Sequence, residues 1–235
     1  MERKHLRNQD LIPQSLLSNA SIVGLGGIGS AIVQLLSIMG FKGLNGYDPD
    51  IMEEHNFGTT LYPESLYREG EVNPKVTMAE EIAAMYGGST LEHVDWKMER
   101  FEGQGQVLSP ITFVCTDDMD SRKVTYDSWL MNNNREIFID LRMDALTMSC
   151  VTVTKDADSY MEYWFPPGGS GEQAPCTMKH TIFCANLIAG IGVNQLFNIL
   201  TKRPYYQYIW QGLSPFNVEL EKFTIIEDQP SLEIT

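Results

Sequence analysis

A cluster of glycines near the N-terminus has the spacing of a phosphate-binding loop. Gly24, Gly26, Gly27 and Gly29 lie in the sequence GLGGIGS, which directly follows a short apolar stretch. Between a strand and a helix, this spacing allows a tight turn, close approach of the backbone to a phosphate, and a helix N-terminus that faces the anion. Asp48 ends the next apolar stretch, where an acid that binds ribose hydroxyls is expected. The pattern predicts a nucleotide site, and the alternative interpretation is a glycine-rich turn without a ligand.

Three polar residues follow that suit phosphate binding. Asp50 and Asn56 lie in DPDIMEEHN, and Lys75 lies in NPKV. A lysine supplies a fixed positive charge, and an amide supplies neutral hydrogen bonds to phosphate oxygens. The structural alternative for Lys75 is a solvated side chain that opens a helix.

An acidic pair ends a later apolar strand. Asp117 and Asp118 lie in TDDMDSR, with Arg122 shortly after them. Carboxylate oxygens are the ligands that Mg²⁺ prefers, so Asp117 is a candidate magnesium ligand. The structural alternative is that both aspartates cap the following helix, with Arg122 pairing with Asp118 inside it.

These motifs, in this order, resemble the ThiF/MoeB/ubiquitin-activating-enzyme-like family of adenylyltransferases over about residues 1–200. The family pattern is GxGGxGS, DxDx5N, a lysine and TDNx4R, and the chain reads GLGGIGS, DPDIMEEHN, VNPK and TDDMDSR. The resemblance implies that Asp48 binds the ribose of ATP, that Asn56 and Lys75 contact its phosphates, and that Asp117 holds Mg²⁺. The nucleotide-binding set implied in this way is Gly24, Gly26, Gly27, Gly29, Asp48, Asp50, Asn56, Lys75, Asp117 and Asp118.

The resemblance also implies a reaction and a substrate. In such enzymes a carboxylate attacks the α-phosphorus of ATP, which gives an acyl-adenylate and pyrophosphate. Because both reactants are anions, the site needs cations and backbone donors more than a base. The implied substrate is the C-terminal tail of a separate ubiquitin-like or sulfur-carrier-like β-grasp protein.

The chain departs from the family where a phosphate-binding arginine is usual. Thr59 stands at the arginine position of the N-x-x-R motif, and Arg68 is a candidate substitute. In the family, an arginine near the N-terminus commonly reaches the partner subunit's site. Arg7, with Arg3 as second choice, is expected to do so in a homodimer, and the alternative is an exposed terminal arginine.

The cysteines suggest one nucleophile and no zinc site. Cys176 lies in PCTMK, which resembles the stretch around the thioester-forming cysteine of the eukaryotic activating enzymes. The alternative is an incidental thiol that begins a helix. No CxxC pair occurs, so no structural zinc is expected. Cys115 and Cys150 lie in apolar strands and Cys184 on an apolar helix, and all three are expected to be buried.

The elements that must position these residues alternate between strand and helix in the first half of the chain. Strands are predicted at residues 21–24, 44–48, 91–95, 111–115 and 137–141, and helices at residues 28–39, 75–86 and 120–132. This pattern predicts an α/β fold with a Rossmann-like, doubly wound, mostly parallel sheet. In the second half, antiparallel strands are predicted at residues 147–154, 160–165 and within 205–226, with a glycine-rich crossover-type loop and a long helix at 180–200. We expect a single domain, residues 1–235, with a nucleotide-binding half at about 1–142 and a second half at about 143–235.

The charge limits the classes of partner. The chain has 31 acidic against 17 basic residues and a formal net charge of −14. This argues against nucleic-acid polymers and anionic membranes as partners. No uninterrupted apolar run approaches about 18 residues, so no membrane span is expected, and no signal peptide is recognised at the N-terminus. We expect a cytoplasmic protein whose substrate offers a basic docking face.

Two other functions use the same glycine loop. An NAD-dependent oxidoreductase would need neither Lys75 nor Asp117. A nucleotide-binding pseudo-enzyme subunit is suggested by Thr59, because a partner could supply the missing cation.

Overall fold

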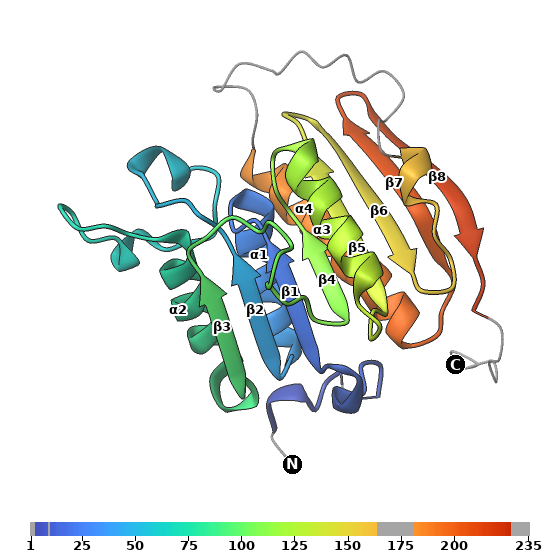
Figure 1. Cartoon of the computed structure of the whole chain (residues 1–235), viewed down its shortest axis with the longest axis horizontal. Coiled ribbons are helices and arrows are strands. Elements are labelled where there is room, and N and C mark those ends of the chain that lie inside the picture. The colour runs from blue at the N-terminus through green and yellow to red at the C-terminus, as the bar shows by residue number, and fades with distance from the viewer. Residues whose placement is uncertain (1–2, 9, 164–180, 227–235) are drawn as a thin grey trace.

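The computed structural model describes residues 3–8, 10–163 and 181–226 of the chain (Figure 1). Within these residues, eight strands form one sheet in the order β3-β2-β1-β4-β5-β6-β7-β8. The strands are β1 (Asn19–Val23), β2 (Gly43–Tyr47), β3 (His93–Lys97), β4 (Ile111–Val114), β5 (Ile137–Met143), β6 (Thr147–Thr154), β7 (Tyr205–Leu213) and β8 (Phe216–Thr224). The α-helices are α1 (Gly27–Met39), α2 (Lys75–Gly87), α3 (Met119–Met131) and α4 (Ile182–Leu200).

The sheet is parallel from β3 to β5 and antiparallel from β5 to β8. This confirms the predicted fold class. The chain proceeds from β1 outward through β2 and β3 and then returns to place β4 on the other side of β1. The carboxyl ends of β1 and β4 therefore flank a topological switch point, where ligands bind in open α/β sheets.

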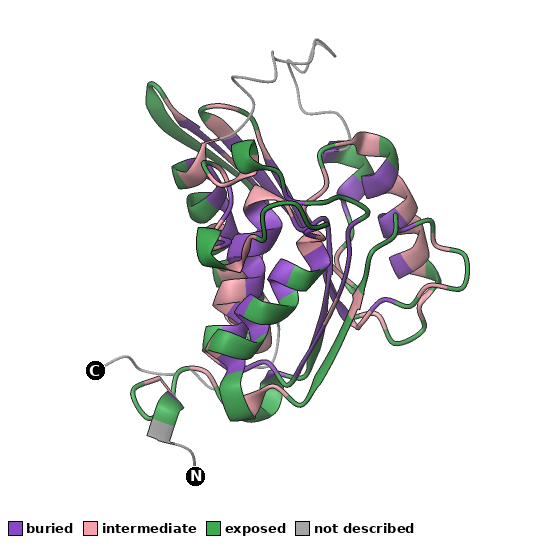
Figure 2. Cartoon of the chain, turned by 90° about the vertical axis from the view of Figure 1, so that its left-hand side faces the viewer, coloured by how far each residue is buried: buried purple, intermediate pink, exposed green. Residues whose placement is uncertain are grey.

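Helices cover both faces of the sheet (Figure 1). On one face, α1 packs against α2 and α4, and all three bury aliphatic side chains such as Ile32, Ile82 and Ile188. On the other face, α3 and the short helix η6 (Tyr160–Tyr163) build an aromatic cluster that includes Trp129 and Phe138. Figure 2 shows the buried residues concentrated in the sheet and on the helix sides that face it. These two layers hold the strand ends in place.

By length and composition alone, α4 is apolar enough to cross a membrane. The sequence predicted no span because no uninterrupted apolar run was long enough. In the structure, α4 packs against α1, β5 and β6, and its Cys184, Ile188 and Leu196 are fully buried there. A core helix of a sheet-centred domain meets the same criteria, because it too buries an apolar face.

One predicted element is wrong in type. Residues 160–165 were expected to form a strand, but Tyr160–Tyr163 is the 3-10 helix η6, and residues 164 and 165 lie outside the described part. The Asp158 side chain accepts a hydrogen bond from the Tyr160 backbone N–H at 3.0 Å, which starts a turn. The turn lets both Tyr160 and Tyr163 reach the aromatic cluster, which a strand with alternating sides would prevent.

Candidate functional site

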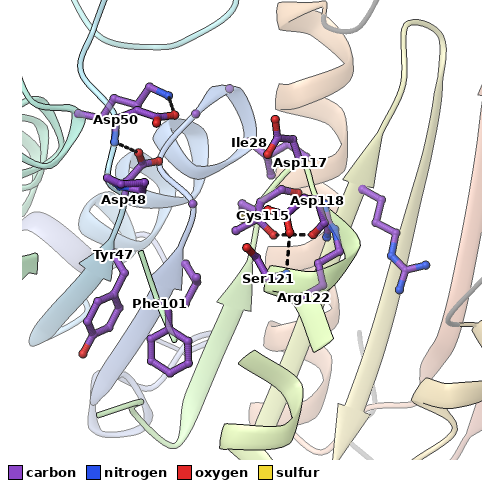
Figure 3. A pocket seen from close by; sticks show the side chains of 18 of the residues that line it. Ile28, Tyr47, Asp48, Asp50, Phe101, Cys115, Asp117, Asp118, Ser121 and Arg122 are labelled. Carbon is purple, nitrogen blue, oxygen red and sulfur yellow. Dashed lines mark hydrogen bonds and ion pairs between the residues drawn. The ribbon is translucent and has the colours of Figure 1, made fainter. Parts of the chain in front are cut away.

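A pocket of about 460 Å³ lies at the carboxyl ends of β1, β2, β4 and β5 (Figure 3). Helices α1, α2 and α3 all begin at its wall, so their N-terminal dipoles favour an anion inside. All residues of the predicted nucleotide-binding set line the pocket except Gly29. The structure therefore brings these residues together in one pocket, and their roles in nucleotide binding stay predictions.

The glycine loop folds as its spacing predicts. Gly24 has φ +90°, and a Cβ there would lie 2.8 Å from the backbone carbon of Cys115. Gly29 lies behind the loop, where a Cβ would collide with the Gly24 carbonyl oxygen. Gly26 has no atom within 4 Å of its Cβ position, so its backbone faces open space in the pocket. The loop thus combines close packing on one side with an exposed backbone on the other.

Asp48 connects the end of β2 to the glycine loop. Its carboxylate is buried and accepts hydrogen bonds from the backbone N–H of Leu25 at 2.6 Å and of Asp50 at 2.8 Å. Burial raises the pKa of Asp48, although the charge of Lys75 and these two N–H groups oppose the rise. A carboxylate has about four acceptor sites, so Asp48 keeps capacity for ribose hydroxyls.

This raised pKa predicts how Asp48→Asn changes stability. Because the folded-state pKa lies above the ordinary value of 3.8, ionisation of Asp48 costs more in the folded chain, and stability falls as pH rises through the two pKa values. Asparagine has no charge to desolvate. We expect the unfolding free energy of the wild type to fall relative to Asp48→Asn as the pH rises above the ordinary pKa of 3.8, measured by urea unfolding. Parallel pH profiles of the two proteins would contradict the expectation.

Lys75 is held against Asp50 at the pocket wall. It is the first residue of α2, and a β-bridge between Ile51 and Pro74 fixes that helix to the Asp50 segment. The Lys75 Nζ lies 2.7 Å from Asp50 Oδ2, and the lysine side chain is only 12% exposed. The alternative of a solvated lysine is therefore wrong, and Lys75 is a positioned cation.

Asn56 and Thr59 lie at the same wall without adding charge. The Asn56 side-chain oxygen accepts a hydrogen bond from the Glu53 N–H at 3.0 Å, which leaves its amide NH₂ group outside this cap. The Thr59 hydroxyl donates to the Asn56 backbone oxygen at 3.1 Å. Arg68, the candidate substitute cation, is exposed beside Glu71 and does not line the pocket. Its turn directs it into solvent, so that prediction is wrong.

Asp117 and Asp118 have different roles. Asp118 caps α3 by accepting a hydrogen bond from the Ser121 N–H at 2.7 Å, which confirms the cap interpretation for this residue. Although burial acts to raise its pKa, Ser121 and the nearby Arg100 hold the pKa of Asp118 below its ordinary value. Asp117 is exposed and lines the pocket without capping the helix (Figure 3).

The acidic residues fit a phosphate-bound metal better than a pre-built metal site. In the described ranges, no cluster of three or more His, Cys, Asp or Glu side chains is arranged for a metal ion. Mg²⁺ usually keeps several waters and binds through one or two carboxylates and the phosphates of its substrate. Asp117, exposed at the pocket, fits that kind of binding.

Two cations at the pocket, Arg100 and Arg142, were not indicated by the motifs. Arg100 follows β3 and donates to Ser121 Oγ at 2.9 Å, and Arg142 is buried near the end of β5. Arg122 forms an ion pair with Asp140, so the alternative in which Arg122 pairs with Asp118 is wrong. All three arginines line the pocket. Arg142 directly follows predicted strand 137–141, and the rule that ligands bind at carboxyl ends of parallel strands was the signal that could have found it.

The outcomes for three other predicted residues differ. Arg7 is exposed, two residues after His5, whose ring lies against Gly40 at the C-terminal end of α1. That end of the sheet is opposite the pocket. Cys176 lies outside the described residues. Cys115 was expected to be buried but is partly exposed and lines the pocket, because β4 ends one residue earlier.

Burial affects the thiols strongly. Desolvation of the thiol raises the pKa of Cys115 far above its ordinary value, although part of the residue surface is exposed, and burial raises the pKa of Cys150 to about 12. Thiolate, the nucleophilic form, is therefore disfavoured at both positions.

The comparisons with known proteins agree with this geometry. The model of the ThiF family matches residues 14–232. The fold is similar to the crystal structure of PaaA, with 19% identity and a TM-score of 0.67 over 94% of this chain and 70% of that one. It is also similar to E. coli MccB with ATP, with 14% identity and a TM-score of 0.69 over 96% and 72% of the two chains.

A complex of E. coli MccB with AMPCPP and MccA gives 15% identity and a TM-score of 0.69 over 96% and 73% of the two chains. No curated protein matches this chain. The family model covers most of the chain, and the mixed sheet is the one found in these ThiF/MoeB-like adenylyltransferases. The chain belongs to the ThiF family.

Proposed function

We propose that this protein binds ATP in the pocket and adenylates the C-terminal carboxylate of a peptide or protein. The observation that carries the proposal is the convergence of Asp48, Lys75 and Asp117 on one pocket beside the glycine loop. These residues come from three separate segments of the chain. Asp48 would bind the ribose, Lys75 would bind the phosphates, and Asp117 would hold Mg²⁺. A pocket of about 460 Å³ is also within the usual range for small-molecule sites.

The reaction needs charge stabilisation and alignment more than proton transfer. The carboxylate oxygen forms a bond to the α-phosphorus while the bond to the bridging α–β oxygen breaks, and the electron pair leaves with pyrophosphate. The backbone N–H groups of the glycine loop and the Lys75 ammonium group stabilise the phosphate oxygens. Asp117 would hold Mg²⁺, which supplies additional neutralisation of phosphate charge when bound.

The substrate is proposed to be a ubiquitin-like or sulfur-carrier-like protein with a flexible tail. The similar structures of MccB in complex with the peptide MccA support a peptide or protein as the second reactant. The net charge of −14 favours a substrate with a basic docking face. Its association should then weaken with added salt, because the Debye length shortens.

Two further parts of the proposal involve Arg7 and Cys176. In a homodimer, Arg7 would reach the partner's pocket, since in its own chain it lies at the opposite end of the sheet. The Cys176 thiolate would attack the acyl carbon of the adenylate, form a thioester and release AMP. A reducible adduct that persists in Cys176→Ala would exclude that step.

The test is ATP–pyrophosphate exchange with a panel of ubiquitin-like and shorter peptide carboxylates. Exchange that depends on one class of tail supports the proposal and identifies the substrate class. Binding of ATP without exchange would favour a pseudo-enzyme subunit. Thr59 suggests that alternative because it replaces the usual phosphate-binding arginine. Enhanced NADH fluorescence on mixing would instead favour the oxidoreductase.

Lys75→Ala is expected to lower kcat/KM for exchange by about 100-fold, because it removes the positioned cation at the phosphate wall. Lys75→Arg should retain part of the activity. The matched control is Lys42→Ala, whose side chain is half exposed beside Glu92 and does not line the pocket. Equal activity of Lys75→Ala and Lys42→Ala would remove Lys75 from the site.

A further inference from the structure

A buried carboxylate on β5 joins two arginines of the pocket wall. Asp140 is completely buried, and its Oδ1 accepts a hydrogen bond from Arg122. Its Oδ2 accepts from Arg142 Nε at 2.8 Å, from Arg142 Nη2 at 2.7 Å, and from the Tyr160 hydroxyl at 2.8 Å. Burial alone would raise the pKa of Asp140, but the two guanidinium groups hold it below the ordinary value. We name Asp140, Arg122, Arg142 and Tyr160 the Asp140 cluster.

Through Arg122, the cluster reaches the turn that carries Asp117. The Arg122 guanidinium donates to the Thr116 backbone oxygen and, at 3.0 Å, to the Leu141 backbone oxygen. In the part of the chain that the structure describes, no hydrogen bond holds the Asp117 side chain. The backbone of the turn therefore sets the position of the Asp117 carboxylate, and Arg122 fixes that backbone to β5.

Through Arg142, the same carboxylate fixes the other side of the pocket. Arg142 is buried, lines the pocket, and donates to the Tyr163 backbone oxygen at 2.7 Å. Two guanidinium groups share one carboxylate, so the cluster carries a net positive charge beside a site for anions. Thr59 stands where the family usually has an arginine, so that side of the pocket lacks one positive charge. The fixed positive charge of the Asp140 cluster compensates in part for the missing charge.

We propose that Asp140 is a positioning residue for adenylation, which holds the Thr116–Asp117 turn through Arg122 and leaves the pocket a fixed net positive charge. This inference rests on the proposed function. In this proposal Asp140 does not contact the reactants. Asp140 affects the chemistry through Arg122 and Arg142.

The first test is Asp140→Asn, which keeps the shape of the side chain and removes its charge. We expect kcat for exchange to fall about 100-fold and the Mg²⁺ concentration for half-maximal rate to rise at least tenfold, since the Asp117 turn loosens. The KM for ATP should stay within about threefold or decrease, because the cluster becomes more positive. If Asp140 had a merely structural role, Asp140→Asn would both lower kcat and raise the KM for ATP.

The matched control is Asp158→Asn. Asp158 accepts a hydrogen bond from the Tyr126 hydroxyl at 2.5 Å, and the Tyr126 ring stacks on Tyr160 with centroids 4.2 Å apart. The control therefore perturbs the same aromatic layer without touching either arginine. Equal kcat values for the two variants would overturn the proposal.

A second measurement covers the outcome in which Asp140→Asn does not fold. Arg122→Lys and Arg142→Lys both keep the charge of the cluster, but only Arg122 contacts the Thr116 backbone oxygen. We expect amide hydrogen exchange of residues 115–121 to be at least tenfold faster in Arg122→Lys, and within threefold of the wild type in Arg142→Lys. Equal exchange rates in both variants would overturn the proposal. A wild type that neither binds nor turns over ATP would refute the proposed function, while the amide exchange would still decide whether the cluster holds the turn.

Discussion

Asp117→Ala is expected to lower kcat for ATP–pyrophosphate exchange by about 1,000-fold, with little change in stability. Asp117 lines the pocket, is exposed, and does not cap α3, so its loss removes the carboxylate proposed to hold Mg²⁺ and disturbs no packing. The measurement is exchange as a function of Mg²⁺ concentration, together with thermal unfolding.

Two neighbouring aspartates serve as controls. Asp120 is exposed in the first turn of α3 and does not line the pocket, so Asp120→Ala should keep normal exchange. Asp118→Ala should instead lower stability by about 1 kcal/mol, because it removes the N-cap of α3. Normal exchange in Asp117→Ala would refute the assignment of Asp117 as the magnesium ligand.

Gly29→Ala is expected to reduce ATP affinity more than about 100-fold and to lower the melting temperature. A Cβ at Gly29 would collide with the Gly24 carbonyl oxygen, so α1 must move away from the loop that it positions. Nucleotide binding is measured by calorimetry and unfolding by circular dichroism.

Other glycines separate the effect on the loop from the effect on stability. Gly190 lies inside α4 with no atom within 4 Å of its Cβ position, so Gly190→Ala should stabilise the protein slightly. Gly26→Ala also meets no atom, but its backbone faces the pocket, so it should keep the fold and weaken ATP binding. A Gly29→Ala protein with unchanged ATP affinity would show that close packing of α1 on the loop is not required.

The parts of the site that the sequence predicted lie where strands end. The glycine loop follows β1, Asp48 follows β2, and Asp117 follows β4. Parallel strands place their carboxyl ends at one edge of the sheet, so residues at those ends meet whatever the details of packing. Local spacing therefore sufficed to assign them to one pocket.

The sequence could not predict which charged side chains pair. Asp140 lies in the predicted strand at residues 137–141, and its pairing with two arginines, one from α3 and one from its own strand, was not predicted. Arg122 had a plausible partner four residues away in Asp118, but its side chain turns towards β5 instead. Such choices depend on the register of the sheet and on how α3 lies across it, which local patterns do not contain.

By itself, the sequence determined the fold class and a set of residues that meet in one pocket, because glycine spacing and residues at strand ends act locally and a parallel sheet brings them together. Only the tertiary structure decided the roles within the pocket: Lys75 is held by Asp50, Asp118 caps a helix, and Asp140 joins two arginines. The physical reason is that burial makes an unpaired charge costly, so each charged side chain takes the partner that packing brings within reach.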